Sequence, residues 1–277
     1  MKGKDYFESI VQDTILIMPY GSGKLRTFSG KDYFLKTGAS SSTYRCEANG
    51  LKELAKPDAI GIACPISVGD DYILTEYIER GVPSTSFYEE FGRSFARMHR
   101  YKSSSFGFYE DNFIGLNPQL NIPTAEERND WALFYFNKRL FYQYEKAEQN
   151  GYVSGELRKG FIKLGNKIES ILKDSQEEPT LLHGDLWSGN YICNEQGDSV
   201  LIDPAVYYGH READLAMTKL FGGFPCSFYR AYQQEYPLQD GWEHRESIYK
   251  LYHVLNHLNL FGKSYLSEAE YLLSVLG

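Results

Sequence analysis

The sequence lacks a long apolar run and lacks paired cysteines. No apolar stretch approaches the roughly 20 residues needed to cross a bilayer, so we expect no membrane span. The cysteines stand far apart, at Cys46, Cys64, Cys193 and Cys226. This spacing excludes a disulfide framework or a zinc site and predicts reduced, mostly buried thiols of a cytoplasmic protein. Residues 1–5 lead into a mixed polar segment, which is unlike a signal peptide.

Basic residues are also in the minority. The chain has 29 Lys and Arg against 37 Asp and Glu, a formal net charge of −8. Proteins that bind nucleic acids usually present a basic face, so we expect no nucleic-acid partner. Such a balance still permits a local basic pocket for phosphates. What the chain has in quantity is aromatic side chains, 23 Tyr and 17 Phe in 277 residues, enough for two lobes with a packed core.

A glycine-rich turn near the N-terminus does not make a P-loop. The turn is Gly21-Ser22-Gly23-Lys24, and a Walker A motif would need a glycine where Met18 stands and a serine or threonine where Leu25 stands. Both conditions fail, which argues against a P-loop NTPase. The turn is better interpreted as part of a hairpin that covers nucleotide phosphates.

The remaining pattern predicts a strand-rich first part and a helical second part. Strands are expected at residues 14–19, 25–28, 33–36, 60–68 and 72–78, with helices at 5–12 and 44–54. The breaker-rich segment 79–83 is the candidate lobe boundary. Beyond it, capping boxes (Ser86 with Glu89, Thr124 with Glu127) open two helices, and a long loop lies between them. A helix over 157–171, strands at 180–183, 191–193 and 200–202, and helices from 204 to the end complete the chain.

A polar constellation stands at the centre of this second part. His183, Asp185 and Asn190 follow a short apolar strand, and Asp203 follows a predicted hairpin. Kinases place the residue that accepts the hydroxyl proton and the groups that bind metal in one order along the chain. That order is His-x-Asp, four further residues, Asn, and a later Asp. Chance would produce the first three in a chain of this length on the order of 1% of the time. The alternative is a polar surface loop with a helix-capping aspartate.

The chemistry of phosphoryl transfer fits these residue types. Asp185 could accept a hydrogen bond from an attacking hydroxyl, since the protein must mainly align the reactants and neutralise charge. The oxygens of Asn190 and Asp203 are hard ligands of the kind that Mg²⁺ takes. His183 is interpreted as a scaffold of the loop that bonds to the backbone.

Upstream residues supply a nucleotide site of the same kind. Lys36 ends an apolar strand, and Glu47 lies eleven positions later in the helix ended by Pro57. A strand lysine paired with a helix glutamate orients the α and β phosphates in kinases. By chain order alone, Glu76, Tyr77 and Ile78 would meet the adenine edge.

Two departures exclude an ordinary protein kinase. Gly184 stands where arginine is usual, and Asp203-Pro204-Ala205 replaces Asp-Phe-Gly, with no Ala-Pro-Glu segment later. The pattern looks like that of the small-molecule branch, the aminoglycoside and choline phosphotransferases.

Longer blocks resemble the fructosamine kinases, also called ketosamine-3-kinases. The blocks are Leu-Leu-His-Gly-Asp-Leu-Trp-Ser-Gly-Asn (181–190), Asp-Pro-Ala (203–205), Tyr-Gly-His-Arg-Glu-Ala-Asp-Leu-Ala-Met (208–217), Phe-Gly-Gly-Phe-Pro (221–225), Pro-Gln-x-Asn (118–121) and Leu-Asn-His-Leu-Asn-x-Phe-Gly (255–262). The similarity covers nearly the whole chain.

This resemblance implies an α+β, two-lobed protein-kinase-like fold. Residues 1–78 would form a nucleotide-binding lobe with a small antiparallel sheet and a hinge at its end, and residues 79–277 a mostly helical lobe. It further implies ATP and Mg²⁺, and phosphorylation of the 3-hydroxyl of ketosamines, free or on glycated proteins. The phosphate product eliminates and frees the amine, so the activity would be deglycation. The sequence leaves monomer and dimer both open.

The resemblance also implies a role for each site residue. Asp185 would be the base, Lys36 and Glu47 the nucleotide pair, and Asn190 and Asp203 the metal ligands. Trp187 is assigned to the substrate, because its ring could lie against a sugar; packing between the lobes is the alternative. Asp214 is expected to anchor the loop by hydrogen bonds rather than to act in catalysis.

Two other functions stay open at this point. One is an aminoglycoside- or choline-type phosphotransferase, and the other is an inactive nucleotide-binding module. The presence of all four residues, Lys36, Asp185, Asn190 and Asp203, argues against the inactive module.

Overall fold

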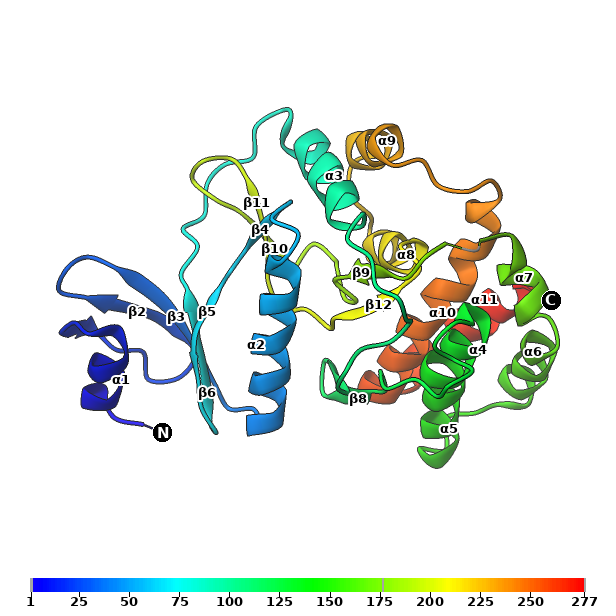
Figure 1. The fold of residues 1–277 in the computed structure, drawn as a ribbon. Helices are drawn as coiled ribbons and strands as arrows, with labels where there is room; N and C mark the ends of the chain where they lie inside the picture. The colour runs from blue at the N-terminus through cyan, green and yellow to red at the C-terminus, as the bar shows by residue number, and fades with distance from the viewer. Residues whose placement is uncertain (1, 176, 277) are drawn as a thin grey trace.

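A five-stranded antiparallel sheet and a long helix form the smaller lobe of the protein. The computed structural model describes residues 2–175 and 177–276. The strand order is β1 (Ile15–Ile17), β2 (Gly23–Thr27), β3 (Asp32–Thr37), β6 (Tyr72–Glu76) and β5 (Pro65–Val68). Helices α1 (Lys4–Val11) and α2 (Ser41–Ala55) accompany the sheet, and the lobe lies at the left of Figure 1.

Alternation along the strands divides the small lobe into two packed faces. Leu25, Leu35 and Leu74 are buried in a cluster with Phe7 of α1. Lys36, the next residue along β3, therefore points to the opposite face, toward α2. The expected strands 14–19, 25–28, 33–36 and 72–78 and helices 5–12 and 44–54 are confirmed within a few residues at their ends.

The strand expected over residues 60–68 is in fact two strands in different sheets. β4 (Gly61–Ile62) pairs in parallel with β11 (Ser199–Leu201), whereas β5 begins at Pro65 and pairs with β6. Proline has no N–H to continue a ladder, and the chain changes partners just before it. β11 also pairs with β10 (Tyr191–Cys193), so this three-stranded sheet joins residues from both halves of the chain.

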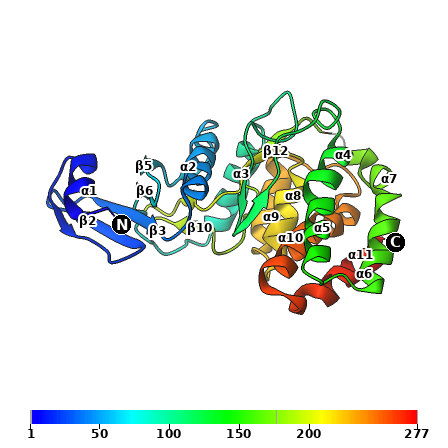
Figure 2. The ribbon, with the colours of Figure 1, turned by 90° about the horizontal axis from the view of Figure 1, so that it is seen from below.

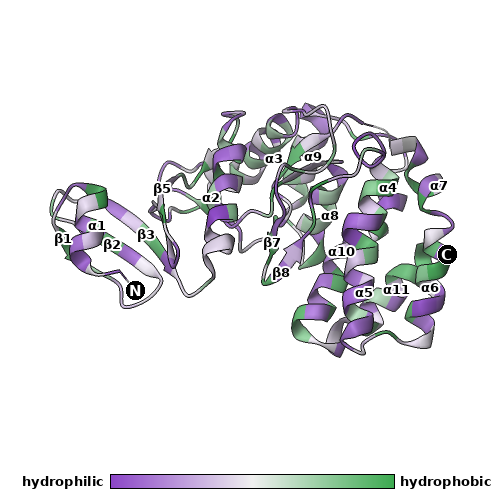
Figure 3. Ribbon diagram, turned by 60° about the horizontal axis from the view of Figure 1, so that its bottom comes forward, coloured by the Kyte–Doolittle hydropathy of each residue, from purple (hydrophilic) through white to green (hydrophobic). Residues whose placement is uncertain are grey.

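The larger lobe is mostly helical and surrounds α10 (Trp242–Phe261). Its other helices are α3 (Phe87–Met98), α4 (Trp131–Tyr135), the π-helical segment η1 (Phe136–Phe141), α5 (Tyr142–Gln149), α6 (Gly155–Gly165), α7 (Ile168–Leu172), η2 (Lys173–Ser175), α8 (Glu212–Leu220), α9 (Cys226–Glu235), η3 (Lys263–Tyr265) and α11 (Leu266–Leu276). Figure 2 shows this lobe at the right, and Figure 3 shows hydrophilic and hydrophobic residues on different parts of α5, α6 and α10. Within residues 2–175 and 177–276, no helix is long and apolar enough to span a membrane.

Three short strands of this lobe were missed in the sequence. β7 (Asn112–Ile114) and β8 (Asn117–Gln119) form a hairpin inside the long loop, and β12 (Tyr207–Gly209) pairs with β9 (Thr180–Leu182). Each is only three residues long, too short to show an alternating pattern. The expectation of helices alone after residue 203 was therefore wrong.

The two predicted capping boxes have different outcomes. Ser86 lies in the helical region (φ −92°, ψ −5°) and makes no side-chain cap, so that box was wrong. The Thr124 box forms: Glu127 accepts from the Thr124 N–H at 2.8 Å, and Thr124 Oγ1 accepts from the Glu127 N–H at 3.3 Å. It stabilises a turn, however, and α4 begins only at Trp131, capped by Asp130.

Two smaller expectations also need correction. The helix over 157–171 is interrupted between α6 and α7. All four cysteines are free thiols as expected, but only Cys193 is buried and Cys226 is exposed. Sequence pattern alone does not reveal which side of a helix or strand a cysteine occupies.

Candidate active site

The loop between β9 and β10 carries the predicted catalytic residues and makes a turn that requires glycine. Gly184 has a φ of +83°, and a Cβ there would lie 2.0 Å from the carbonyl oxygen of Ala205. The segment after Asp203 thus packs directly on the catalytic loop. Arginine, usual in protein kinases at this place, could not occupy this position without moving the backbone of residue 205.

Asp214 holds this loop from beneath. Its two carboxylate oxygens accept the backbone N–H groups of His183 at 2.7 Å and Gly184 at 2.8 Å. The ring of His99 lies 3.2 Å from the same carboxylate. Burial raises the carboxyl pKa, but the His99 hydrogen bond and the other donors outweigh it, so the pKa of Asp214 lies below its ordinary value. A buried, ionised carboxylate thus fixes the start of the loop.

His183 contributes through its ring nitrogens, both of which meet backbone groups. Nε2 lies 2.9 Å from the carbonyl oxygen of Ile202, and Nδ1 accepts the N–H of Asp185 at 3.2 Å. Since Nδ1 accepts, Nε2 carries the proton and donates to Ile202. The histidine therefore links the catalytic loop to the segment that leads into Asp203.

Asp185 lies at the turn of the loop and is held by Asn190. The Asn190 Nδ2 group donates to the carbonyl oxygen of Asp185 at 2.8 Å and to its carboxylate at 3.2 Å. Burial raises the pKa of Asp185 to about 8, partly opposed by this hydrogen bond and aided by the charges of Asp203 and Asp214. A carboxyl group with such a pKa can hold or release a proton near neutrality, which suits general-base chemistry.

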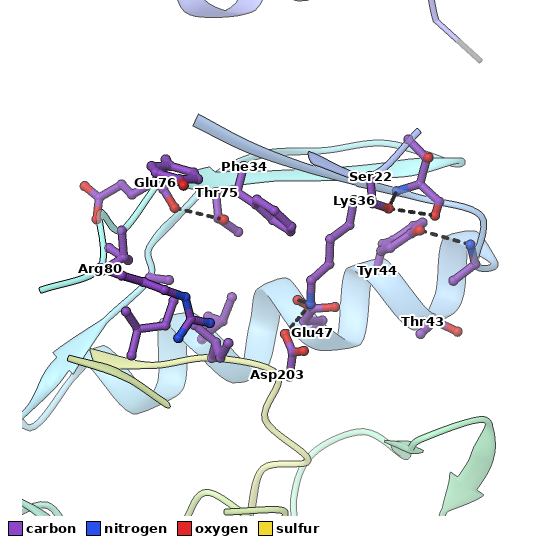
Figure 4. Close-up of a pocket in the computed structure, with 18 residues that line it drawn as sticks. Ser22, Phe34, Lys36, Thr43, Tyr44, Glu47, Thr75, Glu76, Arg80 and Asp203 are labelled. Carbon is purple, nitrogen blue, oxygen red and sulfur yellow. Dashed lines mark hydrogen bonds and ion pairs between the residues drawn. The ribbon is translucent and has the colours of Figure 1, made fainter. Parts of the chain in front are cut away.

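Lys36 bridges the two lobes. Its ammonium Nζ lies 2.7 Å from Glu47 on α2 and also pairs with the carboxylate of Asp203 (Figure 4). Burial alone would lower the lysine pKa, but Glu47 and Asp203 raise it above its ordinary value. The ammonium therefore carries its charge at neutral pH, at the place where the lobes meet.

A cavity of about 510 Å³ lies between the lobes and reaches this lysine. Lys36, Glu47, Asp203 and the predicted hinge residues Glu76, Tyr77 and Ile78 line it, together with Ser22, Phe34, Leu51, Ala63, Ile192 and Ile202. Figure 4 shows Phe34, Thr75 and Glu76 on the side of the sheet, with Lys36 reaching down toward Glu47 and Asp203. Apolar walls at one end and a cation at the other suit a nucleotide, whose base is planar and whose phosphates are anionic.

A second cavity of about 320 Å³ adjoins the first on the side of the catalytic loop. Asp185, Trp187 and Asn190 line it, and it shares Lys36, Thr43, Glu47 and Asp203 with the larger cavity. Its far wall comes from the β7–β8 hairpin through Asn112, Phe113 and Gly115. An acceptor molecule in this cavity would face a nucleotide in the other.

Asn190 and Asp203 fit the requirements of a magnesium ion. Asn190 turns its amide nitrogen to Asp185, which leaves the amide oxygen for another ligand. In residues 2–175 and 177–276 no group of three or more His, Cys, Asp or Glu side chains could hold a metal. Mg²⁺ needs no such cage, because it usually takes one or two protein oxygens together with waters and phosphates.

Asp203 adopts a backbone conformation that is rare for a residue with a side chain. Its φ is +54°. The surrounding bonds define this geometry: the N–H of Ala205 donates to the carbonyl of His183 at 2.9 Å, and Lys36 pairs with the carboxylate. Such strain is concentrated at functional sites when neighbours hold it in place.

Trp187 is partly exposed rather than fully packed. Its ring is 38% exposed, lines the smaller cavity and meets Phe221 edge-on, with ring centroids 6.2 Å apart. The close approach of this ring to Gly189 leaves no room for a side chain at that position. This ring contact is with the larger lobe, and the assignment of Trp187 to the substrate stays a prediction.

Sequence reasoning missed the residues that hold the β7–β8 hairpin against the loop after Asp203. Gln119 Nε2 donates to the carbonyl of Ala205 at 2.9 Å and to Asn112 Oδ1 at 2.8 Å. Asn112 Nδ2 donates to the carbonyl of Val206 at 2.8 Å, and Tyr252 donates to Gln119 Oε1 at 2.7 Å. The sequence signal is the Pro-Gln-x-Asn block at 118–121, which by itself indicates no role for Gln119.

Comparison with known proteins identifies the family. The family model described as fructosamine kinase matches residues 24–276. The chain belongs to the fructosamine kinase family. It is therefore a phosphotransferase that acts on a hydroxyl group, with the two-lobed fold of the protein kinases.

Similar proteins occur in bacteria and plants. A "probable ketoamine kinase" of Synechocystis sp. is 38% identical over 248 residues, which are 87% of this chain and 81% of the relative. The chloroplastic protein-ribulosamine 3-kinase of Arabidopsis thaliana is 40% identical over 246 residues, covering 86% of this chain and 73% of the relative.

Solved structures share the fold over the whole chain. A Thermobifida fusca structure, whose name assigns it provisionally to the fructosamine-3-kinases, has a TM-score of 0.88 at 28% identity and covers 99% of this chain and 97% of its own. An aminoglycoside phosphotransferase in complex with ADP and hygromycin B has a TM-score of 0.64 at 13% identity, covering 100% of this chain and 97% of its own, which shows the fold alone.

Proposed function

We propose that this protein transfers the γ-phosphate of ATP to the 3-hydroxyl of a ketosamine, so that the unstable product releases the amine. The single observation that carries this proposal is the meeting of two cavities at Lys36 and Asp203, with Asp185 and Trp187 in the smaller one. The relatives named ketoamine kinase and protein-ribulosamine 3-kinase support the choice of acceptor. Residues 1–78 and residues 79–277 would close on ATP from opposite sides, with the lobe boundary between 78 and 79.

Asp185 would act as the general base on the acceptor hydroxyl. It would take the proton as the hydroxyl oxygen attacks the γ-phosphorus, and the leaving ADP would carry away the electron pair of the broken bond. Asn190 would hold the Asp185 carboxylate toward the acceptor through the bond that it already makes. Trp187 would lie against the sugar.

Lys36, steered by Glu47, would neutralise the nucleotide phosphates, and the backbone of Glu76, Tyr77 and Ile78 would meet the adenine. Asn190 and Asp203 would hold Mg²⁺, which supplies charge neutralisation on the phosphates when bound. His183 and Asp214 would support the loop without contacting the reactants. The cytoplasmic location stays a prediction, as does the absence of nucleic-acid and membrane partners.

The direct test is ADP release with a panel of acceptors. Ribulosamines, erythrulosamines and fructosamines, free and on a lysine peptide, should give ATP-dependent turnover, with a phosphorylated ketosamine detected by mass spectrometry. Turnover should stop in excess EDTA and return with Mg²⁺. Full activity in EDTA would contradict the metal assignment.

A second candidate is an aminoglycoside- or choline-type phosphotransferase, which the shared fold favours. Preferred turnover of such alcohols over every ketosamine in the same panel would replace the main proposal. No ADP release with any acceptor would leave the nucleotide-binding module as the function.

A further inference from the structure

Five aromatic rings run from the catalytic loop across the surface of the larger lobe. They belong to Trp187, Phe221, His257, Phe261 and Tyr265, which we call the aromatic strip. Successive ring centroids are 6.2 Å apart for Trp187 and Phe221, 4.9 Å for Phe221 and His257, and 5.4 Å for His257 and Phe261. Tyr265 lies 5.2 Å from His257 and 6.1 Å from Phe261. The rings thus form one continuous contact chain.

Part of the strip faces solvent, whereas His257 and Tyr265 are half-buried beneath it. Phe221 is 38% exposed and Phe261 is 64% exposed. Contiguous apolar surface of this kind is uncommon on soluble proteins and marks binding sites more often than isolated exposed rings do. The strip is therefore a candidate ligand surface.

A two-glycine turn places Phe221 on the strip. Gly222 and Gly223 both have positive φ, +87° and +74°, which side-chain-bearing residues rarely adopt. The turn separates exposed Phe221 from buried Phe224, whose ring packs on Phe91 and Phe228 with centroids 5.6 and 5.0 Å away. The Phe-Gly-Gly-Phe block thus fixes one ring in the core and presents the other beside Trp187.

The last turn of α10 connects the strip to the opposite wall of the acceptor cavity. His257 and Phe261 lie four positions apart and so share one face of the helix, with Leu260 beside them. A Cβ on Gly115, which lines that cavity, would lie 3.1 Å from the side chain of Leu260. Figure 1 shows the C-terminal end of α10 beside β8. The strip therefore borders the acceptor cavity at Trp187, and the helix that carries His257 and Phe261 meets the hairpin wall of the same cavity through Leu260.

We propose that the aromatic strip binds an aromatic group carried on the amine of the ketosamine substrate. This inference rests on the proposed function. In a ketosamine the amine is on C1, two carbons from the hydroxyl at C3 that would face Asp185. The amine's substituent must therefore leave the small cavity past its border, and the strip begins there at Trp187.

The ketosamine nitrogen and its aromatic substituent both match the chemistry of the strip. A ketosamine nitrogen is a secondary amine, protonated at neutral pH, and a cation is attracted to the faces of aromatic rings. An aromatic substituent would pack on Phe221 and Phe261 in the edge-on and offset geometries that such rings prefer. The site would thus favour ketosamines of amines that carry an aromatic ring on an alkyl chain over those of small aliphatic amines.

The test compares ketosamines of one sugar on benzylamine and on methylamine. The wild-type protein should show a higher kcat/KM for the benzylamine compound. Phe221→Ala and Phe261→Ala should each reduce the benzylamine-to-methylamine ratio by about 2- to 12-fold. Because both compounds present the same sugar to Asp185, the ratio cancels any general loss of activity or folding in a variant.

Tyr271→Ala is the matched control. Tyr271 on α11 is 64% exposed, as Phe261 is, but makes no ring contact with the strip in the described part of the chain. Its removal should leave the ratio unchanged. A change as large as that of Phe261→Ala would overturn the assignment of the strip.

Other results would overturn the inference or the proposed function. A wild-type benzylamine-to-methylamine ratio near one would contradict binding at the strip, as would a ratio that neither Phe221→Ala nor Phe261→Ala changes. Turnover of the ketosamines in these cases would still support the proposed function. A glycated lysine peptide preferred over both compounds, with the preference lost in Phe261→Ala, would make a polypeptide the occupant instead. If the wild type turns over neither compound, turnover of other ketosamines in the acceptor panel would overturn the strip alone, whereas no turnover in the whole panel would remove the proposed function, so the two failures are distinguishable.

Discussion

Two charged parts of the candidate active site are held in different ways. The catalytic loop rests on Asp214, which is buried and accepts two backbone N–H groups within the larger lobe. Lys36 is held by ion pairs to Glu47 and Asp203, and these three side chains are 24%, 14% and 43% exposed. One part is fixed by buried hydrogen bonds within one lobe, and the other by partly hydrated ion pairs between two lobes.

This difference teaches which part can adjust when ligands bind. Buried donors that lose their acceptor go unsatisfied, so the loop has one stable arrangement. A partly exposed ion pair loses little when water replaces a partner, so Lys36 can exchange Asp203 for a phosphate at low cost. We therefore expect the loop to be preformed and the lysine to change partners, and the following substitutions test that contrast.

The largest effect on activity is expected for Asp185→Asn. The amide keeps the size of the side chain but cannot accept the hydroxyl proton, so kcat should fall by about 10²- to 10⁴-fold. The fold should remain, as measured by circular dichroism and thermal unfolding. Asp70→Asn, at a side chain 82% exposed on the smaller lobe, is the matched control and should keep full activity. Normal turnover by Asp185→Asn would remove the base assignment.

The second-largest loss of activity is expected for Lys36→Met. Losing the cation beside the phosphates should lower kcat/KM for ATP by about 10²- to 10³-fold, whereas stability should change by less than about 1 kcal/mol because the ion pairs are partly exposed. Steady-state kinetics and urea unfolding would measure the two effects. Lys159→Met, which removes an exposed pair with Glu156, should change neither. A large loss of stability in Lys36→Met would break the contrast between the two regions.

Asp214→Ala should lower stability strongly, whereas Lys36→Met should lower activity with little change in stability. Its removal leaves the N–H groups of His183 and Gly184 buried without an acceptor, so unfolding should become easier by about 2–5 kcal/mol. Activity should fall together with stability, since the loop loses its support. Urea titration would measure the change. A stable but inactive Asp214→Ala protein would instead place this residue in the chemistry.

Gln119→Met tests the hairpin that packs on the segment after Asp203. The change keeps the length of the side chain but removes the donor to Ala205 and Asn112, so we expect about a tenfold loss of kcat/KM. The Mg²⁺ concentration needed for half-maximal activity should rise as well, because residues 203–205 lose the hydrogen bond that holds the Ala205 carbonyl in place. An unchanged metal requirement would indicate that Gln119 has only a packing role.

The last effect concerns stability at low pH rather than activity at neutral pH, and it lies away from the site. Burial lowers the pKa of both His210 and His253 to about 3, so they stay neutral in the folded protein. In the unfolded chain they bind protons below about pH 6.5. Stability should therefore be full above that pH and fall by about 1.4 kcal/mol per pH unit for each histidine as the pH drops toward 3. Urea unfolding at pH 7, 6 and 5 would measure the slope, and His210→Phe should make it shallower.

The sequence predicted the order of elements better than their partners. Residues 60–68 looked like one strand, yet the chain changes sheets before Pro65. The hairpin at 112–119 was interpreted as part of a loop, because its strands of three residues carry no periodicity. The local sequence shows alternating hydrophobicity and residues that end a strand. It does not show which strand will pair with it, because the partner lies far away in the chain.

The chemistry of the site was largely readable from spacing. The types and order of Lys36, Asp185, Asn190 and Asp203 indicate a phosphotransferase, and the blocks around them indicate the family that the comparisons established. Spacing carries this information because phosphoryl transfer needs a few fixed residue types on a strand–loop–hairpin frame. Their individual roles stay predictions until the variants are measured.

Only the tertiary structure decided how these residues are supported and what surrounds them. The need for Gly184 follows from the carbonyl of Ala205, twenty-one positions later, and the exposure of Trp187 from its place beside Phe221. The aromatic strip joins three separate stretches of chain that nothing in the sequence connects. Reactive groups follow from residue type and local order, but burial, charge environment and the shape of a binding surface arise from contacts between distant segments.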